Sequence, residues 1–289
     1  MNSRLTIPAR SRRSGLFIAL LFAAAFSCGA GTLAQIHTIV GDIEIELYDQ
    51  DKPVTTQNFI RYVKSGLYQS TLIHRWAPGF VIQGGGFTAT DLTNIDGIFA
   101  PVTNYGTITN EFNVGPRLSN VYGTIAMARV SGETNSANSQ WFINLTNNAF
   151  LDSIDGGFTV FGHVVRGTNV LERFNDVRAN VNGIYQYQRF PPFSELPILQ
   201  VSTNPPTYHL FITDVAVLDT QARARSDGSR EITWKSVSNV VNRIEFTTNF
   251  PPDWRTLAST NGTGGVLTIV DADTQDAQRF YRVRVDYSN

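Results

Sequence analysis

Short runs of alternating apolar and polar residues recur along this chain, and they constrain it to a fold built mainly from strands. In residues 36–47, isoleucines alternate with acidic residues, and Gly41 interrupts the run. A period of two places successive side chains on opposite faces of a sheet. We therefore predict two short paired strands here. The 23 glycines and 12 prolines of the whole chain favour turns between many more strands.

Two segments have the pattern of a helix instead. Residues 53–65 begin with Pro53 and are followed by Gly66, an arrangement that marks a helix of about three turns. A shorter helix is predicted from Thr168, whose hydroxyl can cap the first turn. The apolar residues on one face of this second helix are Val170, Leu171 and Phe174.

The pattern of strands continues as far as Asp219. Strands are predicted within residues 72–82, 123–129, 140–145, 159–165 and 209–218. Residues 177–207 interrupt this series with five prolines and several aromatic residues. Because proline removes a hydrogen-bond donor from a sheet, we predict a long ordered loop there.

The residue composition of the chain changes after Asp219. Residues 220–229 are polar and small, and turn signals such as Asp227-Gly228 and Asn261-Gly262 follow. Short strands are predicted at residues 231–234, 241–247, 266–270 and 279–285. We therefore predict one domain over residues 35–219 and a small β-sandwich over residues 220–289.

The first 34 residues have the layout of a bacterial signal peptide. Four arginines precede an apolar run at residues 16–26, and small residues follow up to Ala34. The run is shorter than the roughly 20 residues of a spanning helix, so we expect no stable membrane span after cleavage. We predict cleavage after Ala34, with Ala30 as the alternative. The protein is then exported, to the periplasm or outside the cell, with the twin-arginine route as an alternative to the ordinary secretory route.

The cysteine count and the net charge bear on disulfide bonds and on nucleic-acid binding. Cys28 is the only cysteine and lies inside the predicted signal peptide, so we expect no disulfide in the mature protein. A lipoprotein modified at Cys28 remains an alternative. The formal net charge is −1 and only 16% of residues are charged, which gives no basic surface for nucleic acid.

Residues 73–85, with the sequence IHRWAPGFVIQGG, closely resemble the signature of the cyclophilins. Three further blocks are similar to this family and occur in its order. Residues 51–68 resemble its first helix, 123–145 its central strand pair and 150–165 its pocket rim. The resemblance covers residues 36–219. It implies a closed eight-stranded antiparallel barrel capped by two helices, followed here by the small sandwich.

The resemblance also implies peptidyl-prolyl cis-trans isomerase activity on proline-containing polypeptides, during the folding of exported proteins. Amide resonance holds a peptide bond planar with a barrier of about 18–20 kcal/mol. A guanidinium that hydrogen-bonds the prolyl nitrogen stabilises the twisted state more than either planar state. Arg75 is the residue we assign to this role, since its charge does not depend on pH near neutrality. No metal, cofactor or covalent intermediate is needed.

The resemblance assigns two sets of residues to the groove. The catalytic positions are Arg75, Phe80, Gln83 and Phe142, and the substrate-binding positions are Val81, Ala128, Arg129, Gln140, Phe150, Leu151 and Phe158. Phe150 and Phe158 stand where many members have a tryptophan and a histidine, which implies weak cyclosporin binding. Arg129 replaces an asparagine of the eukaryotic pattern.

Two other features of the signature have structural explanations. His74 suggests a general base, but isomerisation transfers no proton, so we predict a histidine with a structural role. Gly84, Gly85 and Gly86 suggest a phosphate loop, yet no helix or lysine completes one. We predict a constraint on the backbone instead.

Two alternatives to the isomerase remain open from sequence. One is a non-catalytic module that binds proline segments, which would need the apolar floor but not Arg75. The other places the function in the C-terminal domain, docking the barrel to a partner or surface. Residues 280–285 resemble the last strand of fibronectin type III modules. The aromatic residues of this domain, Trp234, Trp254, Phe280 and Tyr281, are predicted to be core rather than a carbohydrate site.

Overall fold

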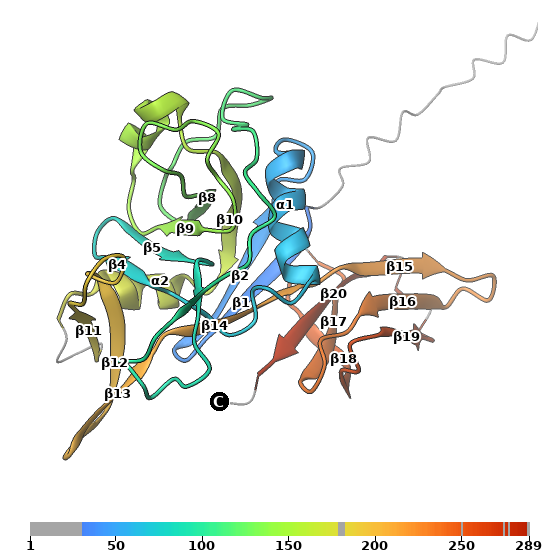
Figure 1. Ribbon diagram of the computed structural model, residues 1–289. Coiled ribbons are helices and arrows are strands. Elements are labelled where there is room, and N and C mark those ends of the chain that lie inside the picture. Colours follow the sequence, from blue (N-terminus) through green and yellow to red (C-terminus); the bar gives the residue numbers. More distant parts are fainter. Residues whose placement is uncertain (1–30, 179–182, 250, 274, 277, 288–289) are drawn as a thin grey trace, which may run out of the picture. The chain divides into compact units, whose positions relative to one another are not determined.

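The computed structural model describes residues 31–178, 183–249, 251–273, 275–276 and 278–287. The predicted signal peptide lies outside the described residues, except for its last four. The described chain is mainly β, as predicted, and strands account for most of its regular secondary structure (Figure 1).

The largest sheet is antiparallel and has the strand order β4-β5-β9-β8-β10-β2-β1-β14-β3-β6-β7. Its strands are β1 (Leu33–Thr38), β2 (Gly41–Leu47), β3 (Thr71–Leu72), β4 (Arg75–Ala77), β5 (Val81–Gly84), β6 (Phe87–Thr88), β7 (Ala100–Pro101), β8 (Thr124–Met127), β9 (Trp141–Asn144), β10 (Val160–Arg166) and β14 (Ile212–Val217). The prediction of two paired strands at residues 36–47 is confirmed by β1 and β2.

This sheet closes into a barrel through residues 71–77. Only Ile73 and His74 separate β3, which pairs with β14, from β4, which pairs with β5. The amide of Ile73 donates to Phe211 O at 2.9 Å and that of His74 donates to Gln83 O at 3.0 Å. The run therefore joins both ends of the order β5-β9-β8-β10-β2-β1-β14, and with it the barrel has eight strands. The predicted closed barrel is confirmed.

Two α-helices occur in the described residues, α1 (Pro53–Lys64) and α2 (Thr168–Asn175), besides the short 3₁₀ helices η1 (Ala149–Asp152) and η2 (Ile154–Gly156). Helix α1 begins at Pro53 as predicted. The carboxylate of Glu111, distant in sequence, accepts hydrogen bonds from the amides of Val54 at 3.0 Å and Thr55 at 2.7 Å. It thereby satisfies donors of the first turn that have no partner within the helix.

The predicted capping of α2 by Thr168 is wrong. The N-cap is Gly167, Thr168 is the first helical residue, and no side chain caps this end. Gly167 has a φ of 90°, and a Cβ placed on it would lie 2.2 Å from Asp42 O. The backbone at residue 167 is left-handed and passes too close to β2 for a side chain. Only glycine fits this cap position without strain.

Among the described residues of 177–207, much of the predicted loop is strand instead. They contribute to a three-stranded sheet of β11 (Ile184–Tyr187), β12 (Leu196–Thr203) and β13 (Pro206–Leu210), which we call the insertion sheet. Its prolines occupy positions that a sheet tolerates: Pro206 is the first residue of β13, and Pro197 precedes Ile198, where the pairing of β12 with β13 begins. The strand predicted at residues 209–218 is consequently divided between β13 and β14.

The C-terminal residues form two three-stranded sheets. One has the order β15 (Thr220–Ala224), β16 (Arg230–Lys235), β19 (Val266–Asp271), and the other β18 (Arg255–Asn261), β17 (Val241–Thr247), β20 (Phe280–Asp286). Ile232 and Trp234 of the first sheet form a buried cluster with Ile244 and Val283 of the second. This is the predicted small β-sandwich with Trp234 in its core, but the prediction of Phe280 as a core residue is wrong, since Phe280 is 38% exposed. The domain boundary near Asp219 and the likeness to fibronectin type III stay predictions.

Buried charge connects the last strand of the sandwich to the barrel. Glu44 of β2 is 1% exposed, and its carboxylate accepts a hydrogen bond from Arg284 Nε of β20 at 2.5 Å. Arg282 and Arg166 lie within 3.5 Å and 3.6 Å of the same carboxylate. A carboxylate removed from water needs such partners, because unpaired buried charge costs several kcal/mol.

We predict that Arg284→Ala lowers the free energy of unfolding by about 2–4 kcal/mol, because it removes the closest partner of a buried carboxylate. Urea denaturation of the mature protein measures this. The control is Arg255→Ala in the same sandwich, which breaks an exposed ion pair with Asp253. That control is expected to cost less than about 1 kcal/mol. Equal losses for the two variants would contradict the assigned role of the buried cluster.

Candidate functional site

The register of three neighbouring strands lines up the predicted catalytic residues. Arg75 of β4 lies opposite Gln83 of β5, and Gln83 lies opposite Phe142 of β9. Phe142 in turn lies opposite Ala126 of β8. Partners in adjacent strands share a face of the sheet. These residues therefore form one row across the barrel surface.

The alternate residues of the same strands fill the barrel interior. Trp76, Ile82, Trp141 and Ile143 belong to the main buried cluster of the barrel. Val81, Ala126 and Phe142 belong instead to a second cluster, against which Phe80, Ala128 and Phe158 pack. Because strands alternate their side chains, the sequence that builds the core also builds a separate apolar floor on the other face.

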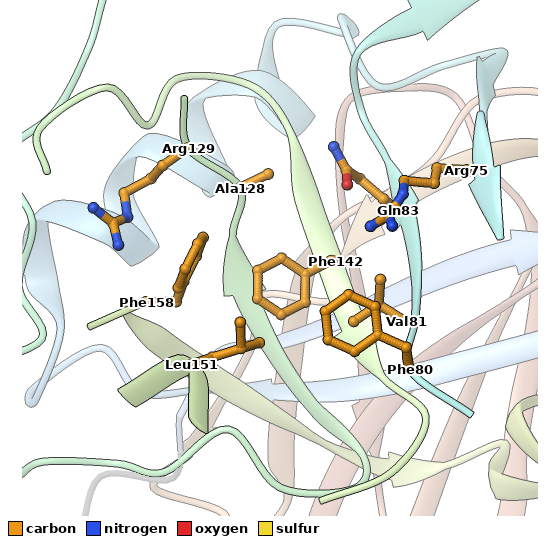
Figure 2. Close-up of a pocket in the computed structure, with 9 residues that line it drawn as sticks. All are labelled: Arg75, Phe80, Val81, Gln83, Ala128, Arg129, Phe142, Leu151 and Phe158. Atoms are coloured by element: carbon orange, nitrogen blue, oxygen red, sulfur yellow. The ribbon is translucent and has the colours of Figure 1, made fainter. Parts of the chain in front are cut away.

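A groove of about 170 Å³ lies over this floor. The residues that line it are Arg75, Phe80, Val81, Gln83, Ala128, Arg129, Phe142, Leu151 and Phe158. Figure 2 shows the Phe142 ring near the centre, with Arg75 and Gln83 along one edge and Arg129 at the opposite end. An apolar floor with a few polar groups at its rim is the usual form of a ligand site.

Arg75 presents one part of its guanidinium to the protein and leaves the rest free. Its Nε donates to Glu195 Oε2 at 2.5 Å, and its Cζ lies 5.6 Å from the centre of the Phe80 ring. Among the described residues, none accepts a hydrogen bond from the two terminal nitrogens. The side chain is 34% exposed. Two donors of a permanent cation are therefore available beside the apolar floor.

Gln83 is oriented by a second amide. Its Nε2 donates to Gln140 Oε1 at 2.8 Å, which directs the Gln83 carbonyl oxygen elsewhere. Gln140 does not line the groove itself, although the resemblance assigns it to substrate binding. The structure places it in hydrogen-bond contact with Gln83, where it fixes the orientation of that side chain.

The glycines that follow Gln83 are required by packing. Gly84 lies opposite Trp141, and a Cβ on Gly84 would lie 2.6 Å from the tryptophan ring. Gly85 has a φ of +75°, and its Cβ would lie 2.6 Å from Ser139 O. The prediction of a backbone constraint at these glycines fits this geometry.

Arg129 and Phe158 form the other end of the groove. The Arg129 guanidinium lies 4.3 Å above the centre of the Phe158 ring. Its terminal nitrogens donate to the carbonyl oxygens of Thr134, Ile154 and Asp155. These contacts hold the guanidinium in place, so that it forms a fixed wall of the groove.

Phe150 lies outside the residues that line the groove but next to them. Its ring stacks on Phe80 with centroids 5.8 Å apart, and the residue is 53% exposed. Leu151, its neighbour in η1, is buried in the floor. The structure thus extends the apolar surface beyond the groove at this side.

His74 lies in the barrel wall between β3 and β4, and only 3% of its surface is exposed. Burial lowers the pKa of His74 from its usual 6.5 to about 4, because the apolar surroundings penalise the charged form. The imidazole is neutral near pH 7. This position fits the predicted structural role.

Glu195 is the one residue of the site that sequence reasoning missed. It contacts Arg75 from 120 positions away in the chain, within a segment predicted to be a loop. No local pattern reports a contact over that separation.

In the described part of the chain, no three His, Cys, Asp or Glu side chains gather as metal ligands. No helix of that part is long and apolar enough to cross a membrane.

Comparisons with known proteins agree with this geometry. A family described as cyclophilin type peptidyl-prolyl cis-trans isomerase/CLD matches residues 33–201. The chain is 43% identical over 167 residues to peptidyl-prolyl cis-trans isomerase A of Dickeya dadantii, covering 57% of this chain and 82% of that protein. It is 38% identical over 159 residues to peptidyl-prolyl cis-trans isomerase B of Escherichia coli, covering 53% and 90%.

A solved structure is also similar. It is a cyclophilin type peptidyl-prolyl cis-trans isomerase of Cryptosporidium parvum, crystallised in the presence of the dipeptide Ala-Pro. The identity is 22%, the TM-score is 0.45, and the match covers 65% of this chain and 99% of that one.

We predict that the stability of the protein falls as the pH is lowered from 6.5 towards 4, in part because of His74. The unfolded chain binds a proton at pH 6.5, whereas the folded chain resists it until about pH 4. The contribution at pH 4.5 is on the order of 2 kcal/mol. Urea denaturation at pH 7 and pH 4.5 measures it, with the non-titrating His74→Gln variant as the control. If both proteins lose the same stability between these pH values, His74 is not responsible.

Proposed function

This chain belongs to the cyclophilin-type peptidyl-prolyl cis-trans isomerases, and we propose that its groove accelerates X-Pro isomerisation in proteins that fold after export. The isomerase activity follows from the family and from relatives that carry this name. The observation that supports its location is the guanidinium of Arg75, with two unoccupied donors at the edge of an apolar floor.

The floor binds the proline ring. Phe142 and Phe158 meet edge to face with ring centroids 5.7 Å apart, and Leu151 belongs to the same apolar cluster. Burying a proline ring on these side chains removes apolar surface from water, which favours binding without favouring either isomer. Binding therefore fixes the ring and leaves the preceding amide to twist.

Arg75 acts on the twisting amide. As the bond rotates out of plane, the lone pair of the prolyl nitrogen is no longer delocalised and becomes a hydrogen-bond acceptor. The terminal nitrogens of Arg75 donate to it, so the interaction is stronger in the twisted state than in either planar state. No proton is transferred and no covalent bond changes.

Gln83 holds the substrate beside Arg75. Its Nε2 is engaged by Gln140, and its position opposite Arg75 in the strand register places it at the same edge of the groove. It contacts the substrate backbone near the rotating bond. A fixed backbone on one side and a fixed ring on the other confine rotation to the X-Pro bond.

The substrates are proteins outside the cytoplasm, in the periplasm or the medium. The signal-peptide layout of the first residues supports export, and the first barrel strand bears on where cleavage occurs. The amide of Thr32 donates to Asp49 Oδ2 at 2.5 Å, and Ala34 is fully buried between Ile45 and Val217. Cleavage after Ala34 would remove Thr32 and Ala34 and with them these contacts to the barrel. Cleavage after Ala30 keeps both residues and is therefore favoured.

Cyclosporin binds this groove weakly. Phe150 is a phenyl ring without a hydrogen-bond donor, and it stacks on Phe80 at the rim. A tryptophan at this position would add an N–H donor and a larger surface. Arg129, held over Phe158, further fills the end of the groove.

The alternative function is a non-catalytic module that binds proline segments, with the C-terminal sandwich docking to a partner or surface. Such a module would require the floor formed by Phe142, Phe158 and Leu151, but it would not require the free donors of Arg75. Replacement of Arg75 therefore distinguishes the two functions.

We predict that Arg75→Ala lowers kcat/KM about 10²–10³-fold, because it removes a charged donor aimed at the transition state. The measurement is the cis-to-trans rate of an Ala-Pro-type peptide with protein that starts at residue 31. The control is Arg225→Ala, an exposed arginine of the sandwich. A folded wild type that binds the peptide without accelerating it would favour the binding module.

We also predict that the mature protein begins at Gly31. Mass spectrometry of the protein from a periplasmic extract of a bacterial host gives this end directly. A product that begins at Gln35 would contradict the proposed cleavage position. Retention of the full-length chain in the cytoplasm would contradict export itself.

A further inference from the structure

We infer that Glu195 is a positioning residue for Arg75 and that the insertion sheet forms part of the working site. This inference rests on the isomerase function proposed above. The Glu195 carboxylate accepts the Nε–H of Arg75 at 2.5 Å, and both side chains are about one third exposed. No other described side chain or backbone group accepts a hydrogen bond from this guanidinium.

The point of attachment determines what the carboxylate does. It binds Nε, the nitrogen nearest the aliphatic stem, and leaves both terminal nitrogens for substrate. A guanidinium is planar, so a fixed Nε–H direction leaves little freedom for the other donors. Without Glu195, an arginine that is one third exposed can adopt many side-chain conformations, of which few aim at the prolyl nitrogen.

Glu195 is itself held firmly by the insertion sheet. Its carbonyl oxygen accepts the amide of Trp76, the residue that follows Arg75, at 2.8 Å. Gln186 of β11 donates to the carbonyl oxygen of the same Trp76 at 3.0 Å. Phe193 and Leu196, on either side of Glu195, are buried in an apolar cluster that also includes residues of the barrel wall. The contact between Glu195 and Arg75 is thus fixed at both its backbone and its side chain.

The attachment also explains why an acid is tolerated beside a catalytic cation. A carboxylate on the terminal nitrogens would occupy the donors that the reaction needs. A carboxylate on Nε holds the group from behind, and the positive charge stays at the edge of the groove. The arrangement makes Arg75 dependent on a segment that was predicted from sequence to be a long ordered loop.

The experiment compares three variants of the mature protein. Glu195→Ala removes the acceptor, and Glu195→Gln keeps a neutral acceptor of the same length. Gln200→Ala is the matched control, because it removes the hydrogen bond from Tyr185 within the same sheet and, among the described residues, does not touch Arg75 or Glu195. Steady-state isomerase kinetics and the Arg Nε–H signals of a ¹⁵N-labelled NMR spectrum are recorded for each. The Arg75 signal is assigned by its absence in Arg75→Lys.

The expected result is a fall in kcat of about 10-fold for Glu195→Ala with KM changed less than about twofold, since the apolar floor is intact. Glu195→Gln restores most of the rate, and Gln200→Ala leaves it unchanged. The protected Arg75 Nε–H signal of the wild type disappears in Glu195→Ala and returns in Glu195→Gln.

Two outcomes would overturn the inference. One is an active wild type whose kcat is unchanged in Glu195→Ala. The other is a loss of rate that appears equally in Gln200→Ala, which would indicate a general effect of the sheet on stability. If the wild type shows no isomerase activity, the proposed function fails, while the NMR signal still reports whether Glu195 holds Arg75.

Discussion

The antiparallel register of β4, β5 and β9 is the constraint on which the rest of the structure depends. It sets Arg75, Gln83 and Phe142 in one row, and the alternation of each strand sends Trp76, Ile82 and Trp141 into the core. A shift of one residue would exchange the two faces and bury the arginine. The core and the groove are therefore two consequences of one pairing, and the tight packing of Gly84 on Trp141 fixes that pairing.

The insertion sheet changes how this barrel wall is completed. Strand β4 lies at one end of the sheet order, where its outer backbone groups lack a neighbouring barrel strand. The segment that carries Glu195 and Gln186 satisfies the amide and the carbonyl of Trp76. An exposed edge is a liability for aggregation and for local opening. Here the same segment that covers the edge also holds the arginine next to it, so protection of the edge and precision of the site have one origin.

The parts of the fold with local periodicity could be predicted from sequence, and the parts decided by distant contacts could not. Residues 36–47 and 53–65 contain their own alternation or helix signals, and the family signature placed Arg75 and its neighbours at one groove. Thr168 has the chemistry of a cap, yet the approach of Gly167 to β2 decided that position. Five prolines indicated a loop at residues 177–207, but Pro191, Pro192 and Pro205 lie in turns, and Pro197 and Pro206 lie within the first two residues of β12 and β13. Glu195 meets Arg75 across 120 positions of sequence, beside a backbone hydrogen bond from Trp76 to Glu195 that no local pattern reports.

The first and last strands of the described chain are joined by a pair of hydrogen bonds. The side-chain amide of Gln35 donates to Val285 O at 2.6 Å, and its carbonyl oxygen accepts from Val285 N at 3.0 Å. Gln35 and Val285 are 250 positions apart in the sequence, so these two bonds close a very long loop. Contacts of such separation form late and slow folding, because the chain must lose loop entropy before they form. The first barrel strand thus reaches its full set of partners only after β20, which carries Val285, has been synthesised.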